Sequence, residues 1–304
     1  MYDCIIIGCG PSGMTCALYL KRAGKSVLVL EKSMIGGQIA LTKSVENYPS
    51  IKQIDGVNLA MQMYDQITSL GVEVRFEEVT KCNLSEKIKT VSTLKNTYQA
   101  KTVFIGTGAY TKPLNVDGEK MYIGKGVSYC ATCDGALFKN KEVAIVGGGN
   151  TSLEDCIYLA DIAQKVYLIH RRDEFRGDNI SVEKIKKLAQ SGKVEMLLSS
   201  EVVGILGQQK LNQIVVKNKK TNVLNNINID ALFIAIGRKP DTEIFEGINL
   251  DDKGYIIADE KMRTNIQGVF AGGDVRNTPL RQIVTACSDG AIASMSINEY
   301  LSDI

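Results

Sequence analysis

Histidine is nearly absent from this chain of 304 residues: only His170 occurs, and arginines follow it. Metal sites built on several histidines, and catalytic triads that use histidine as a general base, are therefore nearly excluded. An excess of one charge is also missing, because 36 Lys and Arg balance 34 Asp and Glu to a net charge of +2. We accordingly expect no nucleic-acid or membrane-surface partner that is recognised by overall charge.

The sequence also lacks a long apolar run and a basic segment before its first apolar stretch, Cys4 to Ile7. It therefore predicts neither a secretory signal nor a membrane-spanning helix, and the expected location is the cytoplasm. The 8 cysteines do not have the spacing of a small disulfide-rich secreted domain, which agrees with a reducing compartment. At about 150 residues per domain, the length predicts two domains.

Two segments have the order of elements that forms a nucleotide-binding βαβ unit. In the first, strands at 2–8 and 26–31 flank a helix at 13–23, with glycines at the first junction. In the second, strands at 142–146 and 165–170 flank a helix that begins near 152 and ends near 163. An α/β fold with two Rossmann-like dinucleotide-binding domains follows.

The remaining segments predict smaller elements. The stretch 217–228, rich in Lys and Asn and without apolar periodicity, is interpreted as a solvated hairpin or loop. The stretch 268–300 ends in a predicted helix, and we expect it to return to the first domain, so that the second domain is inserted within the first. Short alternating runs indicate accessory strands at 72–76, 102–105, 213–216 and 231–236.

The junction in the first unit has the G-x-G-x-x-G spacing of a dinucleotide-binding loop. Gly8, Gly10 and Gly13 lie between the predicted strand and helix, where glycines let the backbone approach a pyrophosphate at the helix N-terminus. Glu31 ends the second strand and can accept hydrogen bonds from ribose hydroxyls. Together these residues predict an adenine dinucleotide, and a glycine-rich tight turn is the structural alternative.

The second unit repeats this loop at 147–152, with Ser152 at the third small position. Where the first unit has Glu31, the second has His170 followed by arginines. A carboxylate there would repel the 2′-phosphate of NADP, whereas Arg171, Arg172 and Arg176 can bind it through charge-assisted hydrogen bonds. We expect NADPH rather than NADH at this loop and FAD at the first; a solvated basic loop is the alternative.

Cys130 and Cys133 form the only C-x-x-C of the sequence, shortly before the second unit. The spacing permits a reversible disulfide, and one thiol of such a pair often has a lowered pKa. Asp134 follows directly and could carry a proton. Half of a zinc site would need two further ligands, and a purely structural bond would constrain only a short loop. We therefore predict a redox-active pair and no metal site.

Taken in order, these motifs resemble those of the low-molecular-weight thioredoxin reductases over nearly the whole chain. The matching segments are GCGPSG at 8–13, GGQ at 36–38, VENYP at 45–49, TGA at 107–109, CATCDG at 130–135, GGGN at 147–150, HRRDEFR at 170–176, AIGRKP at 235–240, GVFAGGDV at 268–275 and RQIVTA at 281–286. Ser152, Gly106 and Gly177 depart from the alanines usual in that family. The resemblance implies two three-layer ββα domains, a homodimer, one tightly bound FAD per subunit and NADPH as the electron donor.

The resemblance also implies which residues bind the two nucleotides. Those for FAD are Gly8, Gly10, Pro11, Ser12, Gly13, Glu31, Gly37, Gln38, Asn47, Thr107, Gly108, Ala109, Gly273, Asp274, Arg281, Gln282 and Ile283. Those for NADPH are Gly147, Gly149, Asn150, Thr151, Ser152, His170, Arg171, Arg172, Arg176, Ile236, Gly237 and Arg238. In that family the match to Cys133 lies against the flavin, the match to Cys130 attacks thioredoxin, and the match to Asp134 supplies a proton.

The predicted activity is that of an NADPH-dependent thioredoxin-disulfide reductase, in which hydride from NADPH passes through FAD to the Cys130–Cys133 disulfide and then to thioredoxin or a thioredoxin-like protein. The FAD-binding domain is expected at 1–112 and 242–304, and the NADPH-binding domain, with the cysteine pair, at 113–241. One alternative is a related flavoprotein that is fed by ferredoxin or acts as a disulfide oxidase. Another is a ferredoxin–NADP reductase of similar fold, and a third is a nucleotide-sensing or zinc-binding module without catalysis.

The nicotinamide site and the cysteine pair fall in the same inserted domain, yet each must contact the flavin of the other domain. We therefore expect the inserted domain to alternate between orientations. The hinges would lie near Lys112-Pro113 and Lys239-Pro240-Asp241.

Overall fold

The computed structural model describes residues 1–42 and 44–304 and divides into two compact units. Unit 1 comprises Met1–Tyr110 and Lys239–Ile304, and unit 2 comprises Thr111–Arg238. The chain thus leaves unit 1 after Tyr110 and returns to it after Arg238. The sequence analysis expected these two boundaries after residues 112 and 241. In the part of the chain that the structure describes, no helix is long and apolar enough to cross a membrane.

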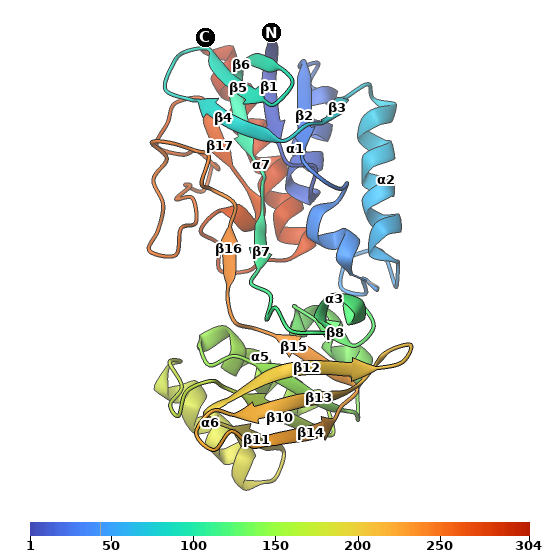
Figure 1. Ribbon diagram of the computed structural model, residues 1–304. Helices are drawn as coiled ribbons and strands as arrows, with labels where there is room; N and C mark the ends of the chain where they lie inside the picture. The colour runs from blue at the N-terminus through green and yellow to red at the C-terminus, as the bar shows by residue number, and fades with distance from the viewer. Residues whose placement is uncertain (43) are drawn as a thin grey trace. The chain divides into compact units, whose positions relative to one another are not determined.

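Unit 1 is built on a seven-stranded sheet of order β3-β2-β1-β6-β5-β4, with β17 beside β6 (Figure 1). Its parallel strands are β1 (Tyr2–Ile7), β2 (Val27–Glu31), β3 (Glu73–Phe76), β6 (Thr97–Ile105) and β17 (Val269–Ala271). The strand β5 (Lys89–Thr93) runs antiparallel to the first half of β6, and β4 (Val79–Asn83) runs antiparallel to β5.

From Cys4 to Ile7, strand β1 is apolar, and these residues are buried on both faces of the sheet. Ile5 and Ile7 belong to one core, and Cys4 and Ile6 belong to the core on the opposite face. Since successive side chains of a strand point to opposite sides, each face receives alternate residues. Such a central parallel strand shows no polar alternation in its sequence.

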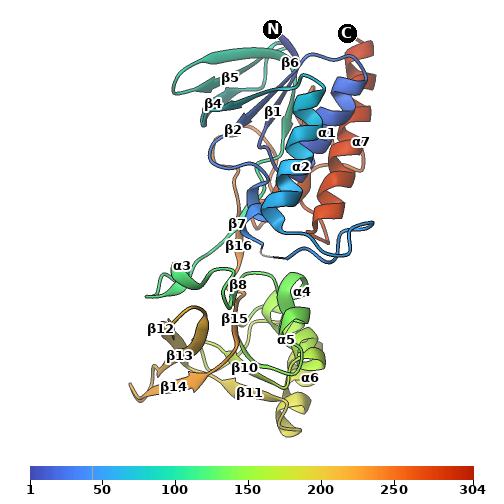
Figure 2. The same ribbon diagram turned by 90° about the vertical axis from the view of Figure 1, so that its right-hand side faces the viewer.

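Three long helices cover one face of this sheet: α1 (Pro11–Arg22), α2 (Gly56–Ser69) and α7 (Ile283–Ser302) (Figure 2). They share one core, to which α1 contributes Met14, α2 contributes Ile67 and α7 contributes Ile297. Proline is tolerated at the start of α1 because the first N–H groups of a helix have no partner within it. Helix α7 packs into this core, so the last residues of the chain belong to unit 1, as expected for the stretch 268–300.

Unit 2 has three layers. A parallel sheet of order β11-β10-β9-β15-β8 lies in the middle. Two helices, α5 (Asn150–Ile162) and α6 (Asn179–Gln190), contribute to the core on one face. A three-stranded antiparallel sheet, β12 (Ser200–Gly207), β13 (Leu211–Asn218) and β14 (Leu224–Asn228), covers the other (Figures 1 and 2). The central strands are β8 (Val127–Ser128), β9 (Glu142–Val146), β10 (Lys165–Ile169), β11 (Val194–Leu197) and β15 (Ala231–Ile234).

The expected fold class is confirmed, with a three-layer Rossmann-like unit inserted into another, but three strands were misplaced. The runs at 72–76, 102–105 and 231–236 are not accessory: they form β3, part of β6 and β15 of the two central sheets. These runs are short and alternate only partly between apolar and polar residues, so their sequences did not identify them as strands of a central sheet. The run at 213–216 is accessory, in β13, and the stretch 217–228 is a hairpin that closes on β14.

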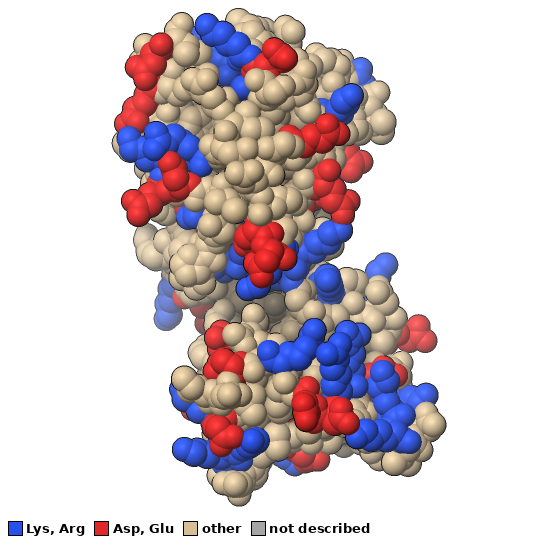
Figure 3. All heavy atoms as spheres, turned by 90° about the vertical axis from the view of Figure 1, so that its left-hand side faces the viewer, with Lys and Arg blue, Asp and Glu red and all other residues tan. Residues whose placement is uncertain are grey.

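The two passages of the chain between the units pair with each other. The outgoing strand β7 (Ala109–Thr111) and the returning strand β16 (Arg238–Pro240) form a two-stranded sheet. The short helices are η1 (Gly37–Leu41), α3 (Glu119–Tyr122), α4 (Ala131–Asp134), η2 (Gly135–Phe138) and η3 (Gly273–Val275). Basic and acidic side chains both occur on the surface of each unit (Figure 3).

Candidate active site

In unit 1, predicted FAD residues follow the carboxyl ends of neighbouring parallel strands. Gly8 follows β1, Glu31 ends β2, Thr107 comes shortly after β6 and Gly273 shortly after β17. Because these strands are neighbours and parallel, the loops meet at one edge of the sheet, where α/β proteins bind their ligands. Residues far apart in the sequence are thereby brought together.

The loop at 8–13 fits a pyrophosphate. A Cβ added at Gly10 would have no heavy atom within 4 Å, so the backbone there faces open space. A Cβ at Gly13 would lie 2.0 Å from the Gly8 carbonyl oxygen, so α1 can approach β1 only with glycine at this position. The N-terminus of α1 has no side-chain cap, which leaves its first N–H groups to an anion.

Glu31 is held firmly beside this loop. Its side chain is buried, and its two carboxylate oxygens accept hydrogen bonds from the backbone N–H groups of Cys9 (2.8 Å) and Ser33 (2.9 Å). These bonds fix the carboxylate at the end of β2. The arrangement fits an acid that accepts hydrogen bonds from a ribose.

Several other predicted FAD residues are bonded to one another. The Asn47 amide donates to Gln282 Oε1 (3.1 Å), and the Gln282 side chain also caps α7, whose first residue is Ile283. The guanidinium carbon of Arg281 lies 4.1 Å from the ring centroid of Tyr255. Gly37 and Gln38 begin η1. Asn47 and the start of α7 therefore form one connected wall.

The loops after β6 and β17 are fastened by two aspartates: Asp241, which the sequence named only as part of a hinge, and Asp289, which it did not name. The Thr107 hydroxyl donates to the Asp241 carbonyl (2.7 Å), and the Asp241 N–H donates to the Gly108 carbonyl (3.2 Å), just before Ala109 begins β7. The Gly273 N–H, beside Asp274 in η3, donates to the buried Asp289 carboxylate (2.9 Å). The Gly273 N–H thus holds its own loop in place through Asp289.

In unit 2, the predicted NADPH residues and the cysteine pair share one sheet edge. The loop at 147–152 follows β9, the segment at 170–176 follows β10, and Ile236 and Gly237 follow β15. The outermost strand, β8, ends at Ser128, two residues before Cys130. Because these strands are parallel neighbours, the redox pair and the nucleotide loops lie along the same edge.

The second glycine loop also fits a pyrophosphate. A Cβ added at Gly149 would meet nothing within 4 Å, and α5 has no side-chain cap before Asn150 and Thr151. Ser152 is fully buried, and its hydroxyl donates to the Gly149 carbonyl (2.8 Å). The serine that replaces the usual alanine is therefore accommodated inside the loop.

The segment after β10 divides into a buried ring and exposed cations. His170 is buried, its ring stacks on Phe175 with centroids 5.6 Å apart, and a Cβ at Gly148 would lie 2.2 Å from its Cε1. Burial lowers the pKa of His170, and so do the nearby arginines. Arg171, Arg172 and Arg176 are exposed, and among residues 1–42 and 44–304 no carboxylate forms an ion pair with them. Three unpaired guanidinium groups fit a phosphate.

Cys130 and Cys133 form a disulfide across α4, with their Cα atoms 5.3 Å apart. The Cys130 sulfur also accepts a hydrogen bond from the Cys133 N–H (3.2 Å). A donor in this position would stabilise a thiolate on Cys130 once the bond is opened. Both cysteines are half-buried, so neither is sealed in the core of unit 2.

Asp134 ends α4 with its carboxylate turned inward. Oδ2 accepts a hydrogen bond from the Ser128 hydroxyl (2.6 Å), while Oδ1 is buried and has no partner among the described residues. Burial raises the pKa of this carboxyl, and the hydrogen bond from Ser128 opposes the rise. A carboxyl so perturbed beside a redox pair suits proton transfer.

The remaining cysteines are free, and all except Cys287 are buried. Burial raises the pKa of the Cys4 and Cys156 thiols to about 12. Thiols with such pKa values are poor nucleophiles. Within the described chain, no group of three or more His, Cys, Asp or Glu is placed to hold a metal ion.

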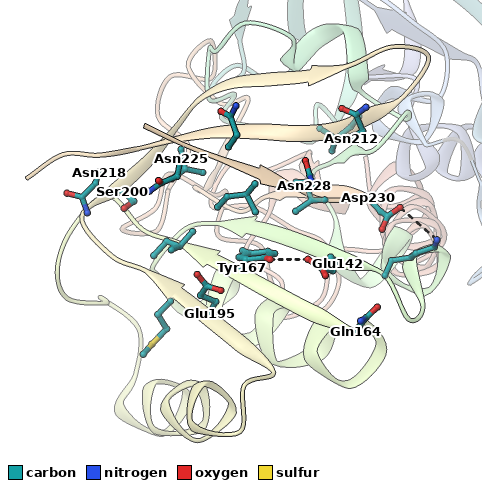
Figure 4. Close-up of a pocket in the computed structure, with 18 of the residues that line it drawn as sticks. Glu142, Gln164, Tyr167, Glu195, Ser200, Asn212, Asn218, Asn225, Asn228 and Asp230 are labelled. Carbon is teal, nitrogen blue, oxygen red and sulfur yellow. Dashed lines mark hydrogen bonds and ion pairs between the residues drawn. The ribbon is translucent and has the colours of Figure 1, made fainter. Parts of the chain in front are cut away.

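A cleft of about 960 Å³ opens between the two sheets of unit 2 (Figure 4). It is lined largely by polar side chains, among them Asn212, Asn225 and Glu195, and the Tyr167 hydroxyl donates to Glu142 Oε2 (2.9 Å) within it. Glu142 begins β9, so the cleft reaches the amino end of that strand. No predicted site residue lines it, and the candidate active site lies elsewhere.

Sequence reasoning missed Ser128 and Glu119. Glu119 is buried and accepts hydrogen bonds from the N–H groups of Leu114 (2.9 Å) and Asn115 (2.7 Å) and from the Tyr129 hydroxyl (2.8 Å). It ties the start of unit 2 to the residue before Cys130. Neither residue belongs to a motif with a mechanism, and only the folded chain shows their partners.

The comparisons with known proteins agree with this geometry. The family described as pyridine nucleotide-disulphide oxidoreductase matches residues 2–290. A thioredoxin reductase of Peptoclostridium acidaminophilum is 40% identical over 99% of this chain and 97% of its own length, and one of Bacillus subtilis is 38% identical over 100% and 96%. The crystal structure of thioredoxin reductase from Streptococcus pyogenes superposes with a TM-score of 0.95 at 41% identity, covering 100% of this chain and 99% of that one. The chain therefore belongs to the pyridine nucleotide-disulphide oxidoreductase family and, within it, to the low-molecular-weight thioredoxin reductases.

Proposed function

We propose that this protein reduces the disulfide of thioredoxin, or of a thioredoxin-like protein, with electrons from NADPH. One observation carries the proposal: the Cys130–Cys133 disulfide lies on the same sheet edge as a glycine loop and three unpaired arginines. NADPH, bound at the second loop, and FAD, bound at the first, would supply the two electrons that open this disulfide. The chain's own residues bind the nucleotides, exchange the disulfide and move the proton.

The residues proposed for FAD are those that meet at the sheet edge of unit 1. The first-turn N–H groups of α1 would bind the pyrophosphate, and Glu31 would accept hydrogen bonds from the ribose. In unit 2, the first turn of α5 would bind the second pyrophosphate. Arg171, Arg172 and Arg176 would bind the 2′-phosphate, which NADH lacks.

Cys130 is proposed as the exchanging nucleophile. Its thiolate would bond to one sulfur of the oxidised substrate while the substrate's S–S bond breaks and the other sulfur leaves as a thiolate. The Cys133 thiolate would then attack Cys130, which restores the disulfide of this protein and releases the substrate as a dithiol. Two protons complete the reduced substrate, and we expect Asp134 to deliver one of them.

Because the nicotinamide and the disulfide would each contact the flavin in turn, we also propose that unit 2 changes its orientation about the β7 and β16 passages. A covalent link between the units that allows a single orientation should abolish turnover and leave bound flavin unchanged. Turnover at the normal rate in the linked protein would show that no such motion is needed. We further expect the protein to be located in the cytoplasm and to form a homodimer. Sedimentation equilibrium would test the dimer.

The deciding experiment is NADPH oxidation by the purified protein in the presence of oxidised thioredoxin. Cys130→Ser should abolish thioredoxin reduction but retain the flavin and its reduction by NADPH. The control is Cys287→Ser, which changes the one partly exposed cysteine outside the pair and should behave like the unmodified protein. If neither NADPH nor NADH supports reduction while reduced ferredoxin does, the donor assignment is wrong.

Nucleotide choice has its own test. Replacing Arg171 and Arg176 together by Gln should raise the KM for NADPH by roughly tenfold or more, since each charge-assisted bond contributes about 1.5–3 kcal/mol, and leave the KM for NADH nearly unchanged. Arg22→Gln, on α1 of unit 1, is the matched control. Equal effects on both nucleotides would exclude recognition of the 2′-phosphate by this segment.

A further inference from the structure

Ser128 ends the edge strand of the sheet in unit 2, directly before the redox pair. Its backbone pairs with Phe233 of β15, and the residue is 7% exposed. The polar atom of a buried serine needs hydrogen-bond partners. Those partners are the redox pair and its acid.

The Ser128 hydroxyl bridges the backbone of Cys130 and the carboxylate of Asp134. Its oxygen accepts a hydrogen bond from the Cys130 N–H (3.1 Å) and donates to Asp134 Oδ2 (2.6 Å). A second acceptor, the Cys130 carbonyl, lies 3.3 Å away. A hydroxyl has one proton and two lone pairs, so it can donate to only one of these acceptors at a time.

Ser128 can satisfy Oδ2 in both protonation states of Asp134. When the carboxylate is ionised, the hydroxyl donates to Oδ2. When Oδ1 carries the proton, Oδ2 is the carbonyl oxygen of the acid and keeps the hydrogen bond from Ser128. No heavy atom has to move between the two states.

The two oxygens of Asp134 are consequently unequal. Oδ2 is fixed by Ser128, whereas Oδ1 is buried and has no partner among the described residues. Oδ1 is therefore the oxygen left to exchange a proton with a sulfur. Burial raises the pKa of the carboxyl, and loss of the Ser128 hydrogen bond would raise it further.

We propose that Ser128 is the positioning residue of Asp134: it fixes Oδ2 and the Cys130 backbone so that Oδ1 presents the exchangeable proton to the redox pair. This inference rests on the proposed function, since it assumes that Asp134 is the acid of a disulfide reductase. Ser128 itself contacts no substrate in this scheme and acts through Asp134.

The test is a double-mutant cycle in the holoenzyme with oxidised thioredoxin. Ser128→Ala should lower kcat about tenfold, as expected for a lost hydrogen bond to a charged group, with KM for thioredoxin unchanged and the pH profile of kcat moved to higher pH. In the Asp134→Asn background the same change should alter kcat by less than about twofold. Ser128→Thr, which keeps the hydroxyl, should restore most of the activity and the original pH profile.

A matched control and a second measurement distinguish a role of Ser128 in positioning Asp134 from a general effect on the stability of unit 2. Ser200→Ala removes another buried hydroxyl of unit 2, which donates to the Leu198 carbonyl (2.8 Å), and should leave kcat and its pH profile unchanged. The carboxyl ¹³C titration of Asp134, assigned by its loss in Asp134→Asn, should move to higher pH in Ser128→Ala only. It requires neither donor nor thioredoxin, so it decides the inference even if the proposed function fails. An unmoved titration, or an equal loss of kcat in both backgrounds, would overturn the inference.

Discussion

Among single residues, Asp155 of α5 carries a pH dependence that belongs to the fold rather than to the reaction. Burial raises the pKa of its carboxyl from 3.8 to about 6, while the charge of Arg238 opposes the rise and that of Glu154 adds to it. The folded chain thus holds this proton over a pH range where the unfolded chain has released it. The contribution of Asp155 to the unfolding free energy should therefore fall as the pH rises from about 4 to about 6 and then stay level.

Asp155→Asn should remove this slope. At pH 7 the variant should be more stable by about 1–2 kcal/mol, which is below the roughly 3 kcal/mol that a two-unit shift represents because the side chain is partly solvated. Urea unfolding followed between pH 4 and 7 measures the difference. Asp161→Asn, at an exposed aspartate of the same helix, serves as the control. A variant that keeps the slope of the unmodified chain would show that the slope comes from other groups.

At the scale of elements, the β1–α1 junction separates two roles of glycine. Gly10→Ala places a methyl group in open space at a backbone conformation that alanine adopts, so the fold should persist while the affinity for FAD falls. Gly13→Ala forces β1 and α1 apart, because its Cβ would lie 2.0 Å from the Gly8 carbonyl oxygen. Flavin absorbance per chain and the thermal unfolding midpoint should therefore respond separately: the first falls in Gly10→Ala, and both fall in Gly13→Ala. Loss of stability in both variants alike would contradict this division.

The Glu119 contact joins two further elements, the start of unit 2 and the strand that leads to Cys130. Glu119→Gln replaces one carboxylate oxygen by an NH₂ group, which faces donors and leaves at least one of them unpaired. We expect a loss of about 2–3 kcal/mol in the unfolding free energy, as for a buried polar group left without a partner. Glu174→Gln, at an exposed glutamate of the same unit, should cost less than about 0.5 kcal/mol. Equal stability of both variants in urea unfolding would show that the hydrogen bonds of Glu119 do not stabilise unit 2.

For the whole molecule, we expect unit 2 to fold without unit 1. Unit 2 is one continuous segment with a core on each face of its sheet, so residues 111–238 expressed alone should unfold cooperatively and bind 2′,5′-ADP. The same segment with Arg171 and Arg176 replaced by Gln should bind the nucleotide at least about tenfold more weakly. Calorimetric titration and urea unfolding measure both. An unfolded segment would show that unit 2 depends on unit 1.

The sequence predicted the features that are local and left out those that depend on folding. The strand–loop–helix units at Gly8 and Gly147 lie within short stretches, and their glycine spacing has a direct physical meaning. Ser128, Asp241 and Asp289 have no such spacing, and Asp289 and Asp241 meet partners 16 and 134 residues away. The strands β3 and β15 were misplaced for a related reason: a strand's place in a sheet depends on neighbours that its own residues do not identify.

The adjacency of β7 and β16 has a consequence for how such a protein can be rearranged. The polypeptide departs from unit 1 and rejoins it at neighbouring, hydrogen-bonded strands, so the ends of the inserted segment lie close together. Joining them directly through a short turn would cost little loop-closure entropy and would leave the first sheet continuous. The segment between Tyr110 and Lys239 is thus exchangeable as a cassette: recombination or design could substitute another redox module here without rebuilding the nucleotide platform that receives it.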